Sequence, residues 1–164
     1  MINPNTTLAA LLSLESVFEK AFQTILSQAD IDRVYITRET ETFETPCVEL
    51  TVIVGDVNLR HQVSIRPNMP EIYDCWDSSL QVRVKTNRGS NSYHHSILCG
   101  KVRAALTLYS LMTTFTSTDA ARFHSITDIR EQGGDTAFDD ATNVDTTVLS
   151  FYLLLNISEN AWQS

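Results

Sequence analysis

Acidic side chains gather near the end of the sequence, before its last apolar segment. No basic residue interrupts this cluster, which consists of Glu131, Asp135, Asp139, Asp140 and Asp145. Carboxylate oxygens are the ligands that Ca²⁺ prefers, so a site for a hard cation is chemically possible, although the spacing matches no EF-hand loop. Three interpretations stay open: a solvated acidic loop, a loop that contacts another protein or lines a lumen, and a metal site.

The histidines do not form a recognisable catalytic or metal-binding pattern. His94 and His95 are adjacent in an expected helix, where neighbouring side chains point about 100° apart and cannot by themselves share one ligand set. His61 and His124 have no nearby carboxylate or thiol at the spacing of a triad or zinc site, and no serine lies in a Gly-x-Ser-x-Gly turn. Gly133-Gly134 is not followed by the residues of a nucleotide-binding loop. We therefore expect no catalytic residue, no metal ligand and no cofactor.

Three cysteines, Cys47, Cys75 and Cys99, are widely spaced and form no Cys-x-x-Cys pair. An odd number of isolated cysteines favours buried free thiols over disulfides or a metal site.

The charge balance opposes wrapped nucleic acid as a partner. The chain has 20 acidic and 12 basic residues among 164, for a formal net charge of -8. Binding along a phosphate backbone depends on Lys and Arg, whereas an acidic surface suits a conduit through which DNA slides without being held. No basic-apolar leader opens the sequence and no apolar run approaches the ~20 residues of a membrane span. We expect a soluble protein made in the cytoplasm, with no membrane partner.

A modest basic cluster is opposite in sign to the acidic segment. It runs across the junction between an expected strand and helix and contains Arg83, Lys85, Arg88, Lys101 and Arg103. Scattered solvated charge and a subunit contact are both compatible with this pattern. For the second interpretation, the residues expected at the contact are Arg83, Arg88, Arg103, Asp135, Phe138, Asp139 and Asp140.

Two helices are expected from apolar residues at steps of three and four. The first begins after the capping residues Asn5 and Thr6 and ends near Gln28, with Glu15, Glu19, Lys20 and Gln23 on the face away from the core. The second runs from Ser90–Ser92 to about Met112. Its expected core stripe consists of Leu98, Val102, Ala105, Tyr109 and Met112, joined by Ile97, Leu108 and Leu111.

Alternating apolar residues predict the strands 34–36, 47–54, 57–65, 72–86, 122–131 and 144–158. Gly55-Asp56 and the segment 132–135 have the composition of turns. The polar stretch up to Asn143 is then a long hairpin tip, with Phe138 as its anchor on a neighbouring protein. The order of elements predicts one α+β domain over residues 1–164, with a mainly antiparallel sheet, two packed helices and a long C-terminal β-hairpin.

A family resemblance rests on this order and on one short motif. The last strand reads Asp145-Thr146-Thr147-Val148-Leu149-Ser150-Phe151-Tyr152-Leu153, and Asn160-Ala161-Trp162 follows it. Together these features resemble tail terminator and tail-completion proteins of tailed bacteriophages. The loop from Thr37 to Pro46 and the segment from Arg66 to Pro70 depart from the small members of that family.

The resemblance implies a structural virion protein without catalytic residues, located at the junction of tail and neck. It implies a ring, usually of six copies, that caps the tail tube and contacts the tail tube protein and neck or head-completion proteins, while DNA passes through the lumen without specific binding. Head-to-tail pairing of a basic and an acidic surface would close such a ring. A neck or head-completion adaptor is the nearest alternative, and a metal-binding module built on the acidic tip is a more distant one.

Overall fold

The computed structural model describes residues 4–66, 69–89, 92–122, 124–139 and 141–158, and the side chains within 14–55, 75–89, 93–121, 124–138 and 141–157. The chain order is α1 (Pro4–Gln28), β1 (Val34–Ile36), β2 (Cys47–Arg66), β3 (Met69–Asn87), α2 (Ser92–Ala105), α3 (Leu108–Thr114), two 3₁₀ turns η1 (Phe115–Ser117) and η2 (Asp119–Arg122), β4 (His124–Asp139) and β5 (Val144–Ser158). Among these described residues, no helix is long and apolar enough to cross a membrane.

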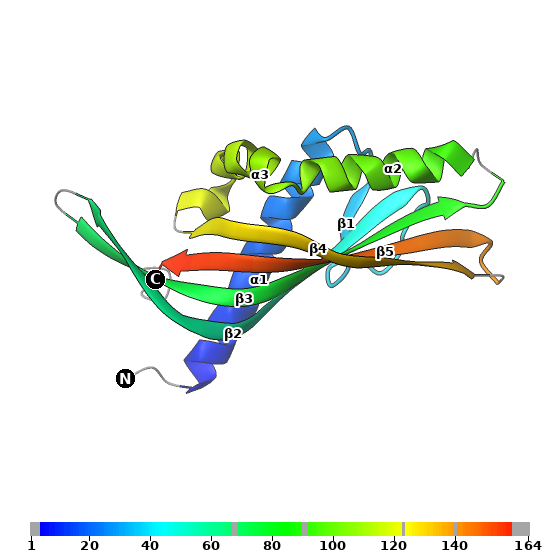
Figure 1. The fold of residues 1–164 in the computed structure, drawn as a ribbon. Coiled ribbons are helices and arrows are strands. Elements are labelled where there is room, and N and C mark those ends of the chain that lie inside the picture. The colour runs from blue at the N-terminus through cyan, green and yellow to red at the C-terminus, as the bar shows by residue number, and fades with distance from the viewer. Residues whose placement is uncertain (1–3, 67–68, 90–91, 123, 140, 159–164) are drawn as a thin grey trace.

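The strands form one sheet in the order β1-β2-β3-β5-β4. β1 runs parallel to β2, and every other neighbouring pair is antiparallel. The α+β class and the long C-terminal hairpin β4–β5 are therefore confirmed. At one end the β2–β3 hairpin extends past the rest of the sheet, because β3 pairs with β5 only from Tyr73 onward (Figure 1).

One face of the sheet is covered by the helices and the other is largely open. The covered face carries alternating buried side chains from the three central strands, which are Val48, Leu50, Val52, Val54, Leu80, Val82, Val84, Leu149, Phe151, Leu153, Leu155 and Ile157. Phe18, Phe22 and Ile25 of α1 and Leu98 and Val102 of α2 complete this single core. The helical stripe expected for residues 14–25 is thus confirmed.

The second helix is shorter than expected and is followed by a separate helix. Leu106 is buried at the end of α2, and Thr107 caps α3 by accepting a hydrogen bond from the Ser110 N–H. This break rotates the later residues, so that Leu111 enters the core while Tyr109 and Met112 are exposed. Leu98 and Val102 face the sheet as predicted, but the placement of Ile97, Tyr109 and Met112 with the core stripe is wrong.

Two segments expected to be turns are irregularities inside strands. β2 continues through Gly55 and Asp56, where its register with β3 shifts between Val54 and Val57. β4 likewise continues through Gly133 and Gly134, with a shift between Glu131 and Gly133 against β5. A bulge inserts an extra residue into one strand without ending it, and glycine is common in bulges as it is in turns. The predicted long hairpin tip is therefore wrong, and the connection between β4 and β5 is reduced to residues 140–143.

The loop between β1 and β2 folds over one end of the open sheet face. The Phe43 ring packs edge-on against Tyr35, and its centroid lies 5.3 Å from the Lys85 ammonium. Lys85 in turn donates a 2.7 Å hydrogen bond to the buried carboxylate of Glu49. This loop, one of the departures from the resembling family, therefore shields a charged pair of the sheet.

Candidate functional site

The residues expected at a subunit contact gather at the end of the sheet where β3, β4 and β5 meet. Arg83 of β3 is opposite Val148 of β5, and Val148 is opposite Asp135 of β4. These three residues form one row on the open face, because paired residues point to the same side of a sheet. Among the described residues, neither Arg83 nor Asp135 forms an ion pair.

Arg88 and Phe138 contact each other within one chain. The Arg88 guanidinium carbon lies 3.9 Å from the centroid of the Phe138 ring, which is a cation–π distance. The Arg88 backbone N–H also donates to the Asn143 carbonyl at 3.0 Å. Both contacts join the end of β3 to the end of the β4–β5 hairpin. The expectation that a neighbour orders this segment stays a prediction.

Arg103 also has an acidic partner within the chain. Its Nε donates to both carboxylate oxygens of Glu131, at 3.1 and 3.2 Å. The expected basic and acidic surfaces are therefore not on two sides of the molecule, because the strand order β3-β5-β4 brings them together. The side chains of Asp139 and Asp140 lie outside the described residues. Of the expected contact residues, Arg83 and Asp135 are the two described ones without an ion-pair or cation–π partner among the described residues.

His95 links α2 to the covered face of the sheet, on the opposite side from this row. One ring nitrogen lies 2.7 Å from the Thr86 hydroxyl and the other lies 2.7 Å from the Thr147 hydroxyl. Both threonines are buried, and Thr147 also lies 3.1 Å from the Thr136 hydroxyl. Burial lowers the pKa of His95, a shift that the Asp145 carboxylate opposes. The neutral ring satisfies both hydroxyls and fixes the first turn of α2 on β3 and β5.

Cys47, Cys75 and Cys99 are buried thiols that form no disulfide with one another, as predicted. Burial raises the pKa of the Cys47 thiol to about 11, so that the reactive thiolate is scarce near neutral pH. Among the described residues, no three His, Cys, Asp or Glu side chains are close enough to hold a metal ion.

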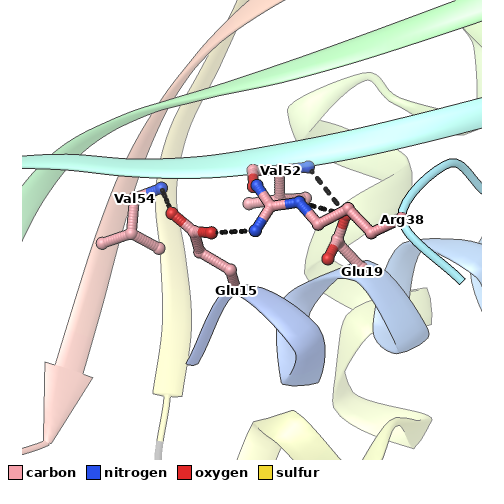
Figure 2. A network of polar contacts seen from close by, with 5 residues as sticks. All are labelled: Glu15, Glu19, Arg38, Val52 and Val54. Carbon is pink, nitrogen blue, oxygen red and sulfur yellow. Dashed lines mark hydrogen bonds and ion pairs between the residues drawn. The ribbon is translucent and has the colours of Figure 1, made fainter. Parts of the chain in front are cut away.

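A buried polar network closes the outer edge of β2 just beyond β1 (Figure 2). The Glu19 carboxylate accepts from the Val52 N–H at 3.3 Å, and the Glu15 carboxylate accepts from the Val54 N–H at 3.1 Å. Arg38 donates to the Val52 carbonyl at 2.7 Å and forms an ion pair with each glutamate. These three side chains give the edge the hydrogen bonds that a neighbouring strand would supply.

This network was missed in the sequence, where both glutamates were expected on the solvent face of the first helix. Glu19 is only 2% exposed, and burial raises its pKa, whereas the Val52 N–H and the Arg38 charge lower it. The available signal was the spacing of four residues, which places Glu15 and Glu19 along one line beside the apolar stripe. The two glutamates bind the edge of β2 only because β1 ends at Ile36 and leaves the later residues of β2 without a strand partner. The spacing within the first helix carries no information about where β1 ends.

The chain matches no protein-family model and no curated protein. Among solved structures, it is similar to a chain of the "Virion of native gene transfer agent (GTA) particle". The two chains are 11% identical, the TM-score is 0.43, and the alignment covers 80% of this chain and 84% of the other. The tail terminator resemblance therefore stays a prediction.

Proposed function

We propose that this chain is a structural protein of a phage-like virion, a tail terminator that forms a ring of six copies between the tail tube and the neck. The observation that carries the proposal is the fold order α-β-β-β-α-α-β-β, which closes with the strand Val144–Ser158 and its Thr-rich, aromatic motif. Apart from the division of the second helix into α2 and α3, this is the order, with its terminal strand, that the family resemblance implies. In this proposal the protein acts by binding other virion proteins through its surfaces, and not by catalysis.

The surface of the fold supports contact with other proteins. One sheet face is left open by the helices, and on it Arg83 and Asp135 have no ion pair among the described residues. Charges of this kind orient partners and raise the rate of encounter, while apolar contacts supply most of the affinity. The net charge of -8 suits a lumen through which DNA passes without being held.

Electron microscopy of the virion tests the proposal. We expect density for the chain in a sixfold ring at the head-proximal end of the tail tube, and tails of uncontrolled length or unjoined tails when the gene is deleted. Density within the neck, above the tube end, would favour the head-completion adaptor. Tails of normal length that join heads in the absence of the protein would refute both assignments.

Calorimetry separates these assembly functions from the metal-binding alternative. Titration of the purified chain with Ca²⁺, Mg²⁺ and Zn²⁺ should release no binding heat. Heat that disappears when Asp135 and Asp145 are changed to Asn would favour a metal-binding module at the hairpin end.

A further inference from the structure

The sheet edge next to α1 is blocked by side chains. An edge strand carries backbone N–H and C=O groups that pair with another strand unless the protein covers them. Gln23 of α1 donates to the Val34 carbonyl of β1 at 2.9 Å. Beyond β1, the network of Figure 2 occupies the edge of β2 at Val52 and Val54. This part of the sheet therefore offers no open edge.

The β2–β3 hairpin extends beyond the other strands, and we name its residues 61–66 and 69–74 the arm (Figure 1). β5 reaches β3 only as far as Tyr73, so most of the arm is a two-stranded ribbon, which by itself is marginally stable in water. The β3 side of the arm contains Pro70, which has no N–H and is typical of an edge that stays unpaired. The β2 side, residues 61–66, contains no proline, pairs in regular register with β3 and has no strand on its other side among the described residues. This side of the arm is an open edge.

β4 is the last strand on the opposite side of the sheet. Two register shifts interrupt its first half, and the second of them ends at Gly133. Bulges of this kind hinder pairing at an edge. The second half, residues 133–139, pairs regularly with β5, and within the described part of the chain no strand lies on its other side. Each of the residues 133–137 is exposed, so this half of β4 is a second open edge.

The two open edges lie on opposite sides and at opposite ends of one sheet. Residues 61–66 lie beyond the end of β5, because Ser158 pairs with Tyr73, whereas residues 133–139 pair with the beginning of β5. A chain therefore cannot pair its own two edges. We infer that residues 61–66 of one copy pair with residues 133–139 of a second copy and extend its sheet.

Pairing of unlike edges satisfies both of them. A contact between two β4 strands, or between two arms, would leave the other edge of each copy open. The two regular segments also have similar lengths. Strand directions alternate from β2 through β3 and β5 to β4, so a second copy's β2 continues the sheet as an antiparallel neighbour of β4.

Repetition of this head-to-tail contact produces a ring or a filament. The contact deepens the proposed function by naming the strands that join the subunits, and the closure of these contacts into a ring rests on that function.

Hydrogen exchange of backbone amides tests the contact in assembled particles. In the dilute chain, the amides of residues 61–66 and 133–139 that point away from their own partner strands should exchange rapidly, and pairing should slow them about tenfold or more. Val52 and Val54 are internal controls and should not change, because their N–H groups already donate to glutamates. Unchanged exchange in particles would overturn the inference. Protection of only one segment would do the same, and would show that another virion protein pairs with it.

Two variants that each remove one edge test whether both partners are copies of this chain. In the armless variant, residues 62–73 are replaced by Asn-Gly, a two-residue turn between the paired residues His61 and Asp74. The β4 edge is tested with Thr136→Pro and Ala137→Pro. Successive residues of a strand direct their N–H groups to opposite sides, so one proline removes an outward N–H and the other removes a hydrogen bond to β5. The one with the higher melting temperature is the edge variant, and the other is its matched control.

Sedimentation velocity of concentrated protein measures the association of these variants. We expect the wild-type chain to form oligomers and each variant alone to stay monomeric. An equimolar mixture of the armless and edge variants should form dimers and nothing larger. Oligomers of the armless variant alone would show that two β4 strands pair and would overturn the inference, as would the absence of dimers in the mixture when the wild-type chain oligomerises. If the wild-type chain is monomeric in solution, the exchange in particles decides.

The two proposals fail separately. Dimers in the mixture, combined with normal tails after gene deletion, would leave the contact standing and refute the tail terminator function. Defective tails after deletion, combined with unchanged exchange in particles, would refute the contact alone.

Discussion

Gly55 of β2 lies directly against the backbone carbonyl of Asp77 in β3. A Cβ atom at residue 55 would overlap that oxygen, so the close approach of the two strands at this bulge requires glycine. We expect Gly55→Ala to lower the free energy of unfolding by about 1–3 kcal/mol, because a backbone atom cannot move aside as a flexible side chain can.

Chemical denaturation measures this loss, with Gly100→Ala as the matched control. Nothing lies within 4 Å of a Cβ placed on Gly100, which is exposed within α2. The control should stabilise the protein by about 1 kcal/mol through its higher helix propensity. Equal effects of the two substitutions would contradict the strand approach described for Gly55.

Arg88 and Phe138 should be energetically coupled within an isolated chain. A double-mutant cycle with Arg88→Ala and Phe138→Ala should give a coupling free energy of about 0.5–1 kcal/mol, since the contact is only partly shielded from water. Thermal or chemical unfolding of the four proteins provides the measurement. If the two single losses in stability simply add, the contact between the Arg88 guanidinium and the Phe138 side chain contributes nothing in solution.

Arg38 should contribute more to stability than Arg130, whose ion pair lies at the surface. Arg38→Met removes the charge that faces the buried carboxylates of Glu15 and Glu19, and we expect a loss of about 1–3 kcal/mol, because the Arg38 side chain is itself 36% exposed and water screens part of the interaction. Arg130→Met is the control, because its pair with Asp128 lies at the surface and is worth about 0–1 kcal/mol. Unfolding in urea measures the free energy of unfolding of both variants. Similar losses would show that the ion pairs in Figure 2 are as accessible to water as the surface pair.

His124 should make the protein less stable in acid. Burial against the Phe18 ring, whose centroid lies 5.3 Å away, lowers the pKa of His124 from 6.5 to about 4. The unfolded chain therefore takes up the proton first as the pH falls, so stability is lost between about pH 6.5 and 4, by up to about 3 kcal/mol.

The slope of stability against pH isolates this histidine. His124→Phe should flatten the slope between pH 6.5 and 4, with a smaller slope remaining from His95, whose pKa is also lowered. An unchanged slope in His124→Phe would contradict the burial of a neutral ring.

Much of the fold could be predicted because alternation and helical spacing are local signals. The predicted bounds of β1 and β5 match the structure. In β5, the alternating row Leu149, Phe151 and Leu153 identifies the buried face, and the more polar residues between them fix which face of the strand points to solvent. Gly55 and Gly133 were misinterpreted because a bulge and a turn require the same residue types. The distinction depends on whether a partner strand continues alongside, which is a property of the sheet.

The candidate site was harder to predict because it depends on strand order. Arg83 and Asp135 are 52 residues apart in the sequence, and they share a row only because β5 lies between β3 and β4. The separation of α2 from α3 depends on the fit of Leu106 and Leu111 into the core, which outweighs a helical pattern that runs on unbroken in the sequence.

The network at the edge of β2 has a consequence for how the chain misfolds. Glu15 and Glu19 belong to α1, so the Val52 and Val54 N–H groups are satisfied only while that helix is docked. Detachment of α1 would leave an apolar strand with an open edge, which is a template for pairing with another chain. Damage to the first helix should therefore cause aggregation into intermolecular β-sheet and not a simple loss of helical content.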